Sequence, residues 1–279
     1  DVLNNKNRHS KNPIRSFFIS LLVAVAVTAC GSGGGGGSSA ANTPPPATAV
    51  ISGNATAGPI ANGTVTAYAV TSSGSKGVAL GTTTTDASGA YSLSLNYTGA
   101  VFLEITGGSY VDEATGQTVN VPTTPGSGLQ TVVSVTVGST LSVQITPLTT
   151  MAAVRAQTMA GGLTIANINS ANQQVSYRFG SIYILSTQPV NPLVANSATG
   201  ATQEAINYGL ILAGLSKQAQ TLGLTNPLNL VTALAQDFSD GSFDGVAGST
   251  PVQLNGSAIS PATGTTELGM AISTFSADT

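Results

Sequence analysis

Apolar and polar residues alternate along much of the region between residues 48 and 146. The alternation is clearest at 91–95, 133–137 and 141–145, where every second residue is apolar. A period of two predicts strands of an antiparallel sheet, each with one buried and one exposed face. The short stretch 138–140, which begins with Gly, predicts a hairpin that joins the last two of these strands.

Further short strands are expected near 49–53, 63–71, 78–85 and 100–106, and on either side of 114–116. Short strands at this spacing, packed into about 100 residues, are typical of a β-sandwich. We therefore predict an N-terminal antiparallel β-sandwich over 48–146.

The period of the pattern changes to about 3.6 residues after this region. Thr146 is a suitable N-cap and Pro147 a suitable first residue for a helix. Helices are predicted over 147–159, 164–179, 202–222 and 227–238, with a shorter one near 268–275. The expected fold class is α+β, in which a separate all-α helical domain over 147–279 follows the sandwich. The loop 186–196 is long enough to carry a binding surface.

The first 29 residues have the pattern of an export signal. Four basic residues precede an uncharged, mostly apolar run over 17–29; they are Lys6, Arg8, Lys11 and Arg15. Because a membrane span needs about 20 residues, the shorter run fits the core of a signal peptide that is removed on export. We predict a lipoprotein signal peptide over 1–29 and, over 30–47, a linker that is flexible because it is rich in Gly, Ser and Pro.

The residues Val27-Thr28-Ala29-Cys30 resemble the lipobox of bacterial lipoproteins. The resemblance implies that Cys30 becomes the first mature residue and carries the lipid anchor, palmitate included. It also implies the outer membrane, because Gly31 rather than Asp follows the Cys. Whether the protein faces the periplasm or the cell surface stays open. The alternative is an ordinary signal peptide followed by an unmodified thiol.

A second resemblance lies within the predicted sandwich. Residues 58–60, 63–68 and 85–93 resemble carboxypeptidase regulatory-like domains, in which a strand ends in Thr-Asp, turns through Gly and resumes with Tyr. Asp86 can cap this turn, Gly89 can adopt a positive φ, and Tyr91 begins the buried face. The resemblance covers about 50–121 and implies a prealbumin-like β-sandwich that serves stability or display, so it supplies no catalytic residue.

Removal of the leader changes the charge and the available chemistry. The chain of 279 residues has 8 Lys and Arg, 11 Asp and Glu, one His and one Cys, and only 7% of its residues are charged. Cleavage after residue 29 leaves four basic and ten acidic residues, a formal net charge of −6, and takes His9 away. Without an imidazole, Ser-His-Asp and Cys-His catalysis are excluded. Four dispersed cations form no phosphate-binding stripe, so no nucleic-acid partner is expected.

The most acidic local segment is 237–245, which contains Asp237, Asp240 and Asp244. Three carboxylates this close could ligate Ca²⁺, although their spacing does not match the EF-hand loop. The alternative is a helix end followed by two Asp-Gly turns. No other metal or cofactor is expected.

Three other patterns each have a structural alternative. Asp112 and Glu113, with Glu104 as a distant partner, could form a glycosidase carboxylate pair, but adjacent strand residues point to opposite faces. The stretch from Ser73 to Lys76 spells a serine–lysine motif without its companion motifs. The aromatic residues of the sandwich could stack on sugars or pack in the core; they are Tyr68, Tyr91, Tyr97, Phe102 and Tyr110.

These observations predict a non-enzymatic, lipid-anchored outer-membrane protein that serves adhesion, envelope structure or partner binding. Its partners would be the membrane, through the anchor on Cys30, and a protein or a glycan. One alternative is a carbohydrate-binding or carbohydrate-processing accessory protein. Another is a subunit of an export or surface-assembly complex.

Overall fold

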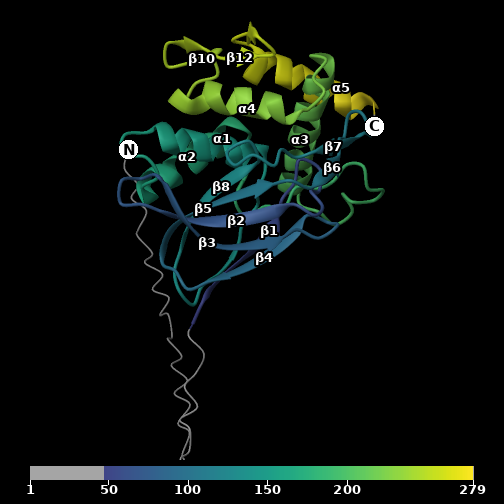
Figure 1. Cartoon of the computed structure of the whole chain (residues 1–279). Helices are drawn as coiled ribbons and strands as arrows, with labels where there is room; N and C mark the ends of the chain where they lie inside the picture. The colour runs from purple at the N-terminus through teal and green to yellow at the C-terminus, as the bar shows by residue number, and fades with distance from the viewer. Residues whose placement is uncertain (1–46, 279) are drawn as a thin grey trace, which may run out of the picture. The chain divides into compact units, whose positions relative to one another are not determined.

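The computed structural model describes residues 47–278, so the predicted leader, Cys30 and most of the linker lie outside the described residues. Strands come first along this part of the chain and helices follow, which confirms the α+β class (Figure 1). The strands before the first helix are β1 (Ala49–Asn54), β2 (Thr64–Val70), β3 (Lys76–Thr84), β4 (Ala90–Leu95), β5 (Gly99–Thr106), β6 (Ser109–Val111), β7 (Thr118–Asn120), β8 (Gln130–Val135) and β9 (Thr140–Ser142).

The helices begin and end close to the predicted positions. They are α1 (Pro147–Thr158), α2 (Ile165–Arg178), α3 (Gln203–Thr221), α4 (Leu228–Asp237) and α5 (Leu268–Asp278). The sequence pattern missed the short elements between α4 and α5, because strands of two residues and turns of three to five residues are too short to show a period. These are the 3₁₀ turn η1 (Phe238–Asp240), the strands β10 (Val246–Ala247), β11 (Thr250–Pro251), β12 (Gln253–Leu254) and β13 (Ser257–Ala258), and the π-helical turn η2 (Thr263–Glu267).

Two sheets share one apolar core. The order β3-β2-β5-β8 forms an antiparallel sheet of four strands, and β4-β1-β9 forms a sheet of three. Ile51 in β1, Val65 in β2 and Leu103 in β5 belong to the same buried cluster. The alternation in the sequence therefore identifies the side chains that meet in this core.

The predicted hairpin between 133–137 and 141–145 is wrong. β8 pairs with β5, whereas β9 runs parallel to β1 in the other sheet. Gly138, with a φ of +86°, lies in a tight turn that leads the chain from one sheet to the other. Alternation shows which face of a strand is buried but not which strand lies beside it, because both sheets turn their apolar faces to the same core.

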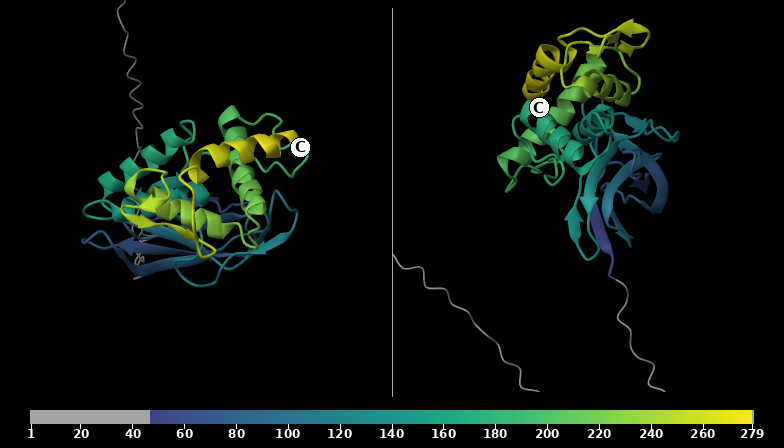
Figure 2. Two further views of the ribbon diagram at one scale, coloured as in Figure 1. Left: turned by 90° about the horizontal axis from the view of Figure 1, so that it is seen from above. Right: turned by 90° about the vertical axis from the view of Figure 1, so that its left-hand side faces the viewer.

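Strand β5 is buried on both faces. Val101, Leu103 and Ile105 belong to the core that the two sheets share. Phe102, between them, belongs instead to a second cluster with alanines of α1 and α2. The helices gather on one side of the strands (Figure 2), with α1 and α2 against β8 and β5.

The helical part also contacts the strands through α4. Leu228 and Val231 of α4 belong to the core cluster of the two sheets. The part predicted as a separate helical domain thus packs against the strands through two apolar clusters. Whether residues 147–279 fold by themselves stays a prediction.

Among residues 47–278, no helix is both long enough and apolar enough to cross a bilayer.

Threonine hydroxyls join the start of α1 to strand β8. Thr146 caps α1 as predicted, since its Oγ1 accepts the N–H of Thr149 at 3.2 Å, and Thr149 Oγ1 accepts the N–H of Thr146 at 2.8 Å. Thr149 Oγ1 also donates to the carbonyl of Gln130, and the Gln130 N–H donates to Thr150 Oγ1. Thr146 Oγ1 bonds the hydroxyl of Tyr208 in α3. Buried backbone groups of Gln130 thus find partners in the helix, as buried polar groups must.

We expect Thr149→Val to destabilise the fold by about 2–3 kcal/mol in the free energy of unfolding. The substitution keeps the shape of the side chain but removes the hydroxyl that caps α1 and donates to Gln130. Urea denaturation measures the change. The matched control is Thr221→Val, because Thr221 is exposed and its hydroxyl bonds a carbonyl of its own helix. Equal losses for the two variants would contradict the role of Thr149.

Candidate functional site

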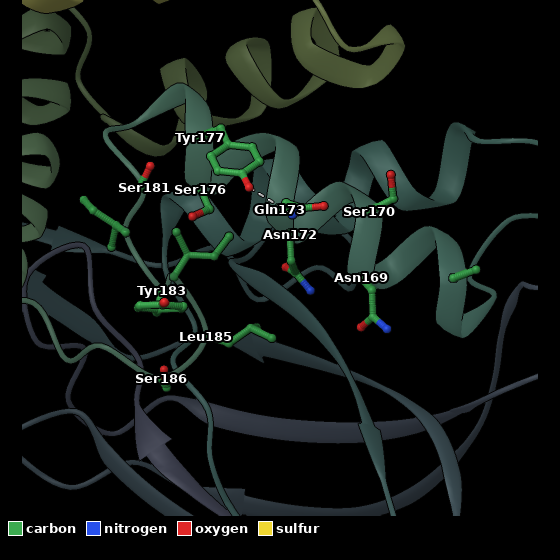
Figure 3. Close-up of a pocket in the computed structure, with 13 residues that line it drawn as sticks. Asn169, Ser170, Asn172, Gln173, Ser176, Tyr177, Ser181, Tyr183, Leu185 and Ser186 are labelled. Atoms are coloured by element: carbon green, nitrogen blue, oxygen red, sulfur yellow. Dashed lines mark hydrogen bonds between the residues drawn. The ribbon is translucent and has the colours of Figure 1, made fainter. Parts of the chain in front are cut away.

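A groove of about 830 Å³ lies beside α2 (Figure 3). One wall is the outward face of α2, and the other is the segment 181–186 that follows the helix. A volume of this size lies within the range of small-molecule binding sites in proteins. We call this hollow the α2 groove.

The sequence of α2 divides the helix into an apolar and an amide-rich face. Ile168, Ala171 and Val175, spaced three and four residues apart, are buried. The face turned to the groove carries Asn169, Ser170, Asn172, Gln173, Ser176 and Tyr177. Because side chains three and four apart share one face of a helix, burial of the apolar stripe turns the amides outward.

A sharp reversal after α2 builds the second wall. Gly180 and Ser181 both have positive φ, +86° and +64°, and the N–H of Ser181 donates to the carbonyl of Ser176 at 2.7 Å. The returning chain buries Ile182 and Ile184, which lie in the core of the helical part. Residue 183, which lies between these two anchors, is exposed.

Hydrogen bonds fix this second wall in place. The N–H of Tyr183 and the hydroxyl of Thr187 both donate to Oε1 of Glu204, in the first turn of α3. The carbonyl of Leu185 accepts the N–H of Gln144 at 2.7 Å. The wall is therefore held both by α3 and by the chain that follows β9.

The surface of the groove is uncharged and rich in unused hydrogen-bonding groups. Tyr183 is 72% exposed and Tyr177 66% exposed. Gln173 Nε2 donates to the hydroxyl of Tyr177 at 3.2 Å. The side chains of Asn169 and Asn172 make no hydrogen bond to any residue in the described part of the chain, and they extend toward the side where Tyr183 lies (Figure 3).

The aromatic residues singled out from the sequence do not form this surface. Tyr91, Phe102 and Tyr110 are buried, and Tyr91 donates its hydroxyl to the carbonyl of Val143 at 2.7 Å. The two exposed tyrosines of the groove were missed. The signal that could have indicated this surface is the concentration of Asn, Ser and Gln over 167–174, within a predicted helix. A helix face with many such residues leaves many hydrogen-bonding groups free to bind a ligand.

The turn at 86–89 has the predicted geometry. Oδ1 of Asp86 accepts the N–H groups of Ser88 and Ala90 and the hydroxyl of Ser88. These bonds lower the pKa of Asp86, the Ser88 hydroxyl most of all. Gly89 has a φ of +78°, and Tyr91 begins the buried face. The pattern that carries the family resemblance is thus a side-chain-capped turn.

The carboxylates proposed as a glycosidase pair make separate structural bonds. Glu104 is 1% exposed and bonds Lys76 Nζ at 3.0 Å. Asp112 accepts the hydroxyl of Ser216 in α3, and Glu113 Oε1 accepts the N–H of Gly58 at 2.9 Å. All three carboxylates are buried. Their contacts fit a structural role better than substrate binding, which needs access.

The serine–lysine motif is likewise divided between two sets of contacts. Ser73 Oγ bonds Thr71 Oγ1 at 2.9 Å, whereas Lys76 Nζ bonds Glu104 and lies 4.7 Å from the ring centre of Tyr68. These contacts engage the lysine with the sheet and the serine with its own loop.

The acidic segment 237–245 forms turns. Asp237 Oδ1 accepts the N–H groups of Asp244 and Gly245, and the two oxygens of Asp240 accept those of Ser242 and Gly248. Within residues 47–278, no three His, Cys, Asp or Glu side chains lie together as a metal site would need. The turn alternative accounts for these contacts, and calcium binding stays an untested prediction.

Asp237 Oδ2 is buried without a hydrogen-bond partner in the described structure. Burial raises the pKa of Asp237, and the nearby carboxylates of Asp244 and Asp240 raise it further, against the bonds from Gly245 and Asp244 that lower it. A raised pKa means that this carboxyl holds its proton more tightly than an exposed one.

Glu113 gives a testable pH dependence. Burial raises its pKa from 4.5 to about 8, and the charge of Asp112 adds to this. Between these two pH values the folded chain keeps a proton that the unfolded chain has lost, so the contribution of Glu113 to stability is fully present below pH 4.5 and is lost as the pH rises to about 8. We expect Glu113→Gln to remove most of this decline, on the order of 4 kcal/mol.

Urea denaturation at a series of pH values measures this effect. The control is Asp278→Asn, because the carboxylate of Asp278 is 59% exposed. An unchanged slope of stability against pH in Glu113→Gln would contradict the assignment.

Neither protein-family models nor curated proteins match the chain. Solved structures do match it. One is a proposed carbohydrate-binding protein from Pseudomonas aeruginosa, with 17% identity over 38% of this chain and 92% of that one, and a TM-score of 0.24. Another is the major pilin subunit of Bacillus cereus, with 16% identity over 36% and 30% and a TM-score of 0.24. A third is a 9R-lipoxygenase from Cyanothece, with 14% identity over 40% and 18% and a TM-score of 0.22. At these values the likenesses carry no argument about function.

Proposed function

We propose that this chain is a non-enzymatic lipoprotein of the bacterial outer membrane, which binds a partner in the α2 groove. The observation that carries the proposal is the lining of that groove. It consists of amide, hydroxyl, phenol and apolar side chains, with no carboxylate, imidazole, thiol or amine among the lining residues. Such a surface can bind and orient a ligand, but it has no group whose ordinary pKa suits acid–base catalysis near neutral pH.

The strands serve, in this proposal, as a scaffold. The carboxypeptidase regulatory-like pattern around Asp86 and Gly89 supports a β-sandwich, as do the two sheets with a common apolar core. Sandwich domains of this kind display a binding surface on a rigid body. The groove stands on that body because α1 and α2 pack on the outer face of β5 and β8.

The anchor rests on the sequence alone. A basic leader, a short apolar run and a lipobox-like sequence precede Cys30, and a Gly-, Ser- and Pro-rich tract follows it. From its composition and length alone, we expect this tract to place the body on the order of 20–25 Å from the lipid. This leaves the groove free to meet soluble or surface-bound partners.

Cys30→Ala tests the anchor. Without the thiol no acyl chain can be attached, so we expect the protein to move from the membrane fraction to the soluble fraction and to lose incorporation of labelled palmitate. Ser39→Ala, in the same linker, is the matched control and should remain in the membranes. Unchanged membrane partition of Cys30→Ala would show that the anchor is assigned wrongly.

A photoreactive amino acid in place of Gln173 tests the groove as the binding surface. We expect it to form crosslinks to an envelope component in intact cells, because Gln173 is exposed and lines the groove. The same amino acid in place of Ser273, on the exposed side of α5, is the control and should form few. Equal crosslinking at both positions would contradict a specific groove.

Saturable turnover of a glycoside or an ester, abolished by one carboxylate substitution, would overturn the non-enzymatic assignment.

A further inference from the structure

The inner surface of the α2 groove has a composition that few ligand classes fit. None of its lining residues carries a charge, so it offers nothing to neutralise a phosphate, a carboxylate or an amine. A charged ligand that enters would lose hydration without gaining an opposite charge. The groove therefore favours a neutral ligand.

The groove presents hydrogen-bonding groups in excess. Asn169 and Asn172 each offer two donors and an acceptor, and neither amide bonds another residue in the described part of the chain. Gln173 donates one amide hydrogen to the hydroxyl of Tyr177, and its amide oxygen makes no hydrogen bond within the described part of the chain. A ligand that fits these groups carries many hydroxyl or amide groups of its own.

The aromatic side chains add a flat apolar surface. Tyr183 is held through its backbone by Glu204 and by the buried neighbours Ile182 and Ile184, while its ring is 72% exposed. Leu185 lines the same wall. An exposed aromatic ring on a fixed backbone, in a groove that amides also line, suits a ligand with one apolar face and a rim of polar groups, because the ring can contact the face and the amides the rim.

We infer that the α2 groove binds a neutral oligosaccharide, with Tyr183 against the apolar face of a sugar ring and Asn169 and Asn172 bonded to its hydroxyl groups. Sugars combine a C–H face with a rim of hydroxyls and, when they carry no acid or amine, no charge. The inference rests on the proposed function, since it names the ligand class of the same groove. The groove is partly open to solvent, so a bound chain of sugars can extend beyond it.

Calorimetric titration tests this inference on the full chain, purified in a detergent that has no sugar headgroup. The probes are cellohexaose, maltohexaose and the hexamer of N-acetylglucosamine, with the hexamer of galacturonic acid as the charged counterpart. We expect at least one neutral hexamer to bind with a Kd of about 1 mM or tighter, and the charged hexamer to bind more weakly.

Two variants of one residue separate stacking from folding. Tyr183→Ala should weaken binding of the neutral hexamer about tenfold, whereas Tyr183→Phe should retain it because the ring remains. Asn172→Asp keeps the shape of the amide but removes its donors, and it should also weaken binding. Thermal unfolding of each variant shows whether the fold is intact.

Three outcomes would overturn the saccharide assignment. They are no binding of any neutral hexamer up to about 10 mM, tighter binding of the charged hexamer, and equal binding by Tyr183→Ala and the unchanged chain. If crosslinks from position 173 then lead to a protein or to a second copy of this chain, the groove is still a binding surface but for another class of partner. If position 173 also forms no specific crosslink, the proposed function fails as well.

Discussion

Strand β5 has to be covered on both faces, and the arrangement of the other elements follows from this need. Val101, Leu103 and Ile105 are apolar on one face and Phe102 on the other. The second sheet covers the first face, and α1 and α2 cover the second. Burial of each such side chain stabilises the fold by roughly 1.5–3 kcal/mol, so neither covering layer is dispensable. The threonines at the start of α1 then hold the helical layer to the polar backbone of Gln130.

The α2 groove is a consequence of that packing. Once Ile168 and Ala171 turn to the sheet and Val175 turns to the core of the helical part, the amide face of α2 must turn outward. The left-handed residues Gly180 and Ser181 then return the chain along this face. Tyr183 is exposed because Ile182 and Ile184 on either side of it are needed in the core. The groove thus arises on a rigid element, and buried residues on either side hold the backbone of its exposed tyrosine.

The scarcity of charged residues affects both the interior of the fold and its surface. Several of the carboxylates are used inside the fold: Glu104 pairs with Lys76, Asp112 and Glu113 bond α3 and the loop at Gly58, and Asp237 caps a turn. These groups are occupied by structure, and none of them lines the α2 groove, whose lining residues are uncharged. Low charge in the sequence therefore corresponds to a particular kind of surface, one that bonds through amides and hydroxyls.

The sequence by itself determined the local elements: the strands with a period of two, the limits of the first four helices, the Thr146 cap and the Asp86 turn. Each depends on residues a few positions apart, whose periodicity or side-chain reach is visible in the chain. Only the tertiary structure decided that β8 and β9 lie in different sheets, that Asp112 and Glu113 are both buried, and that Tyr183 lines the same groove as the amides of α2. These outcomes depend on contacts between distant residues, and equal apolar faces can pair in several ways until the whole core is packed.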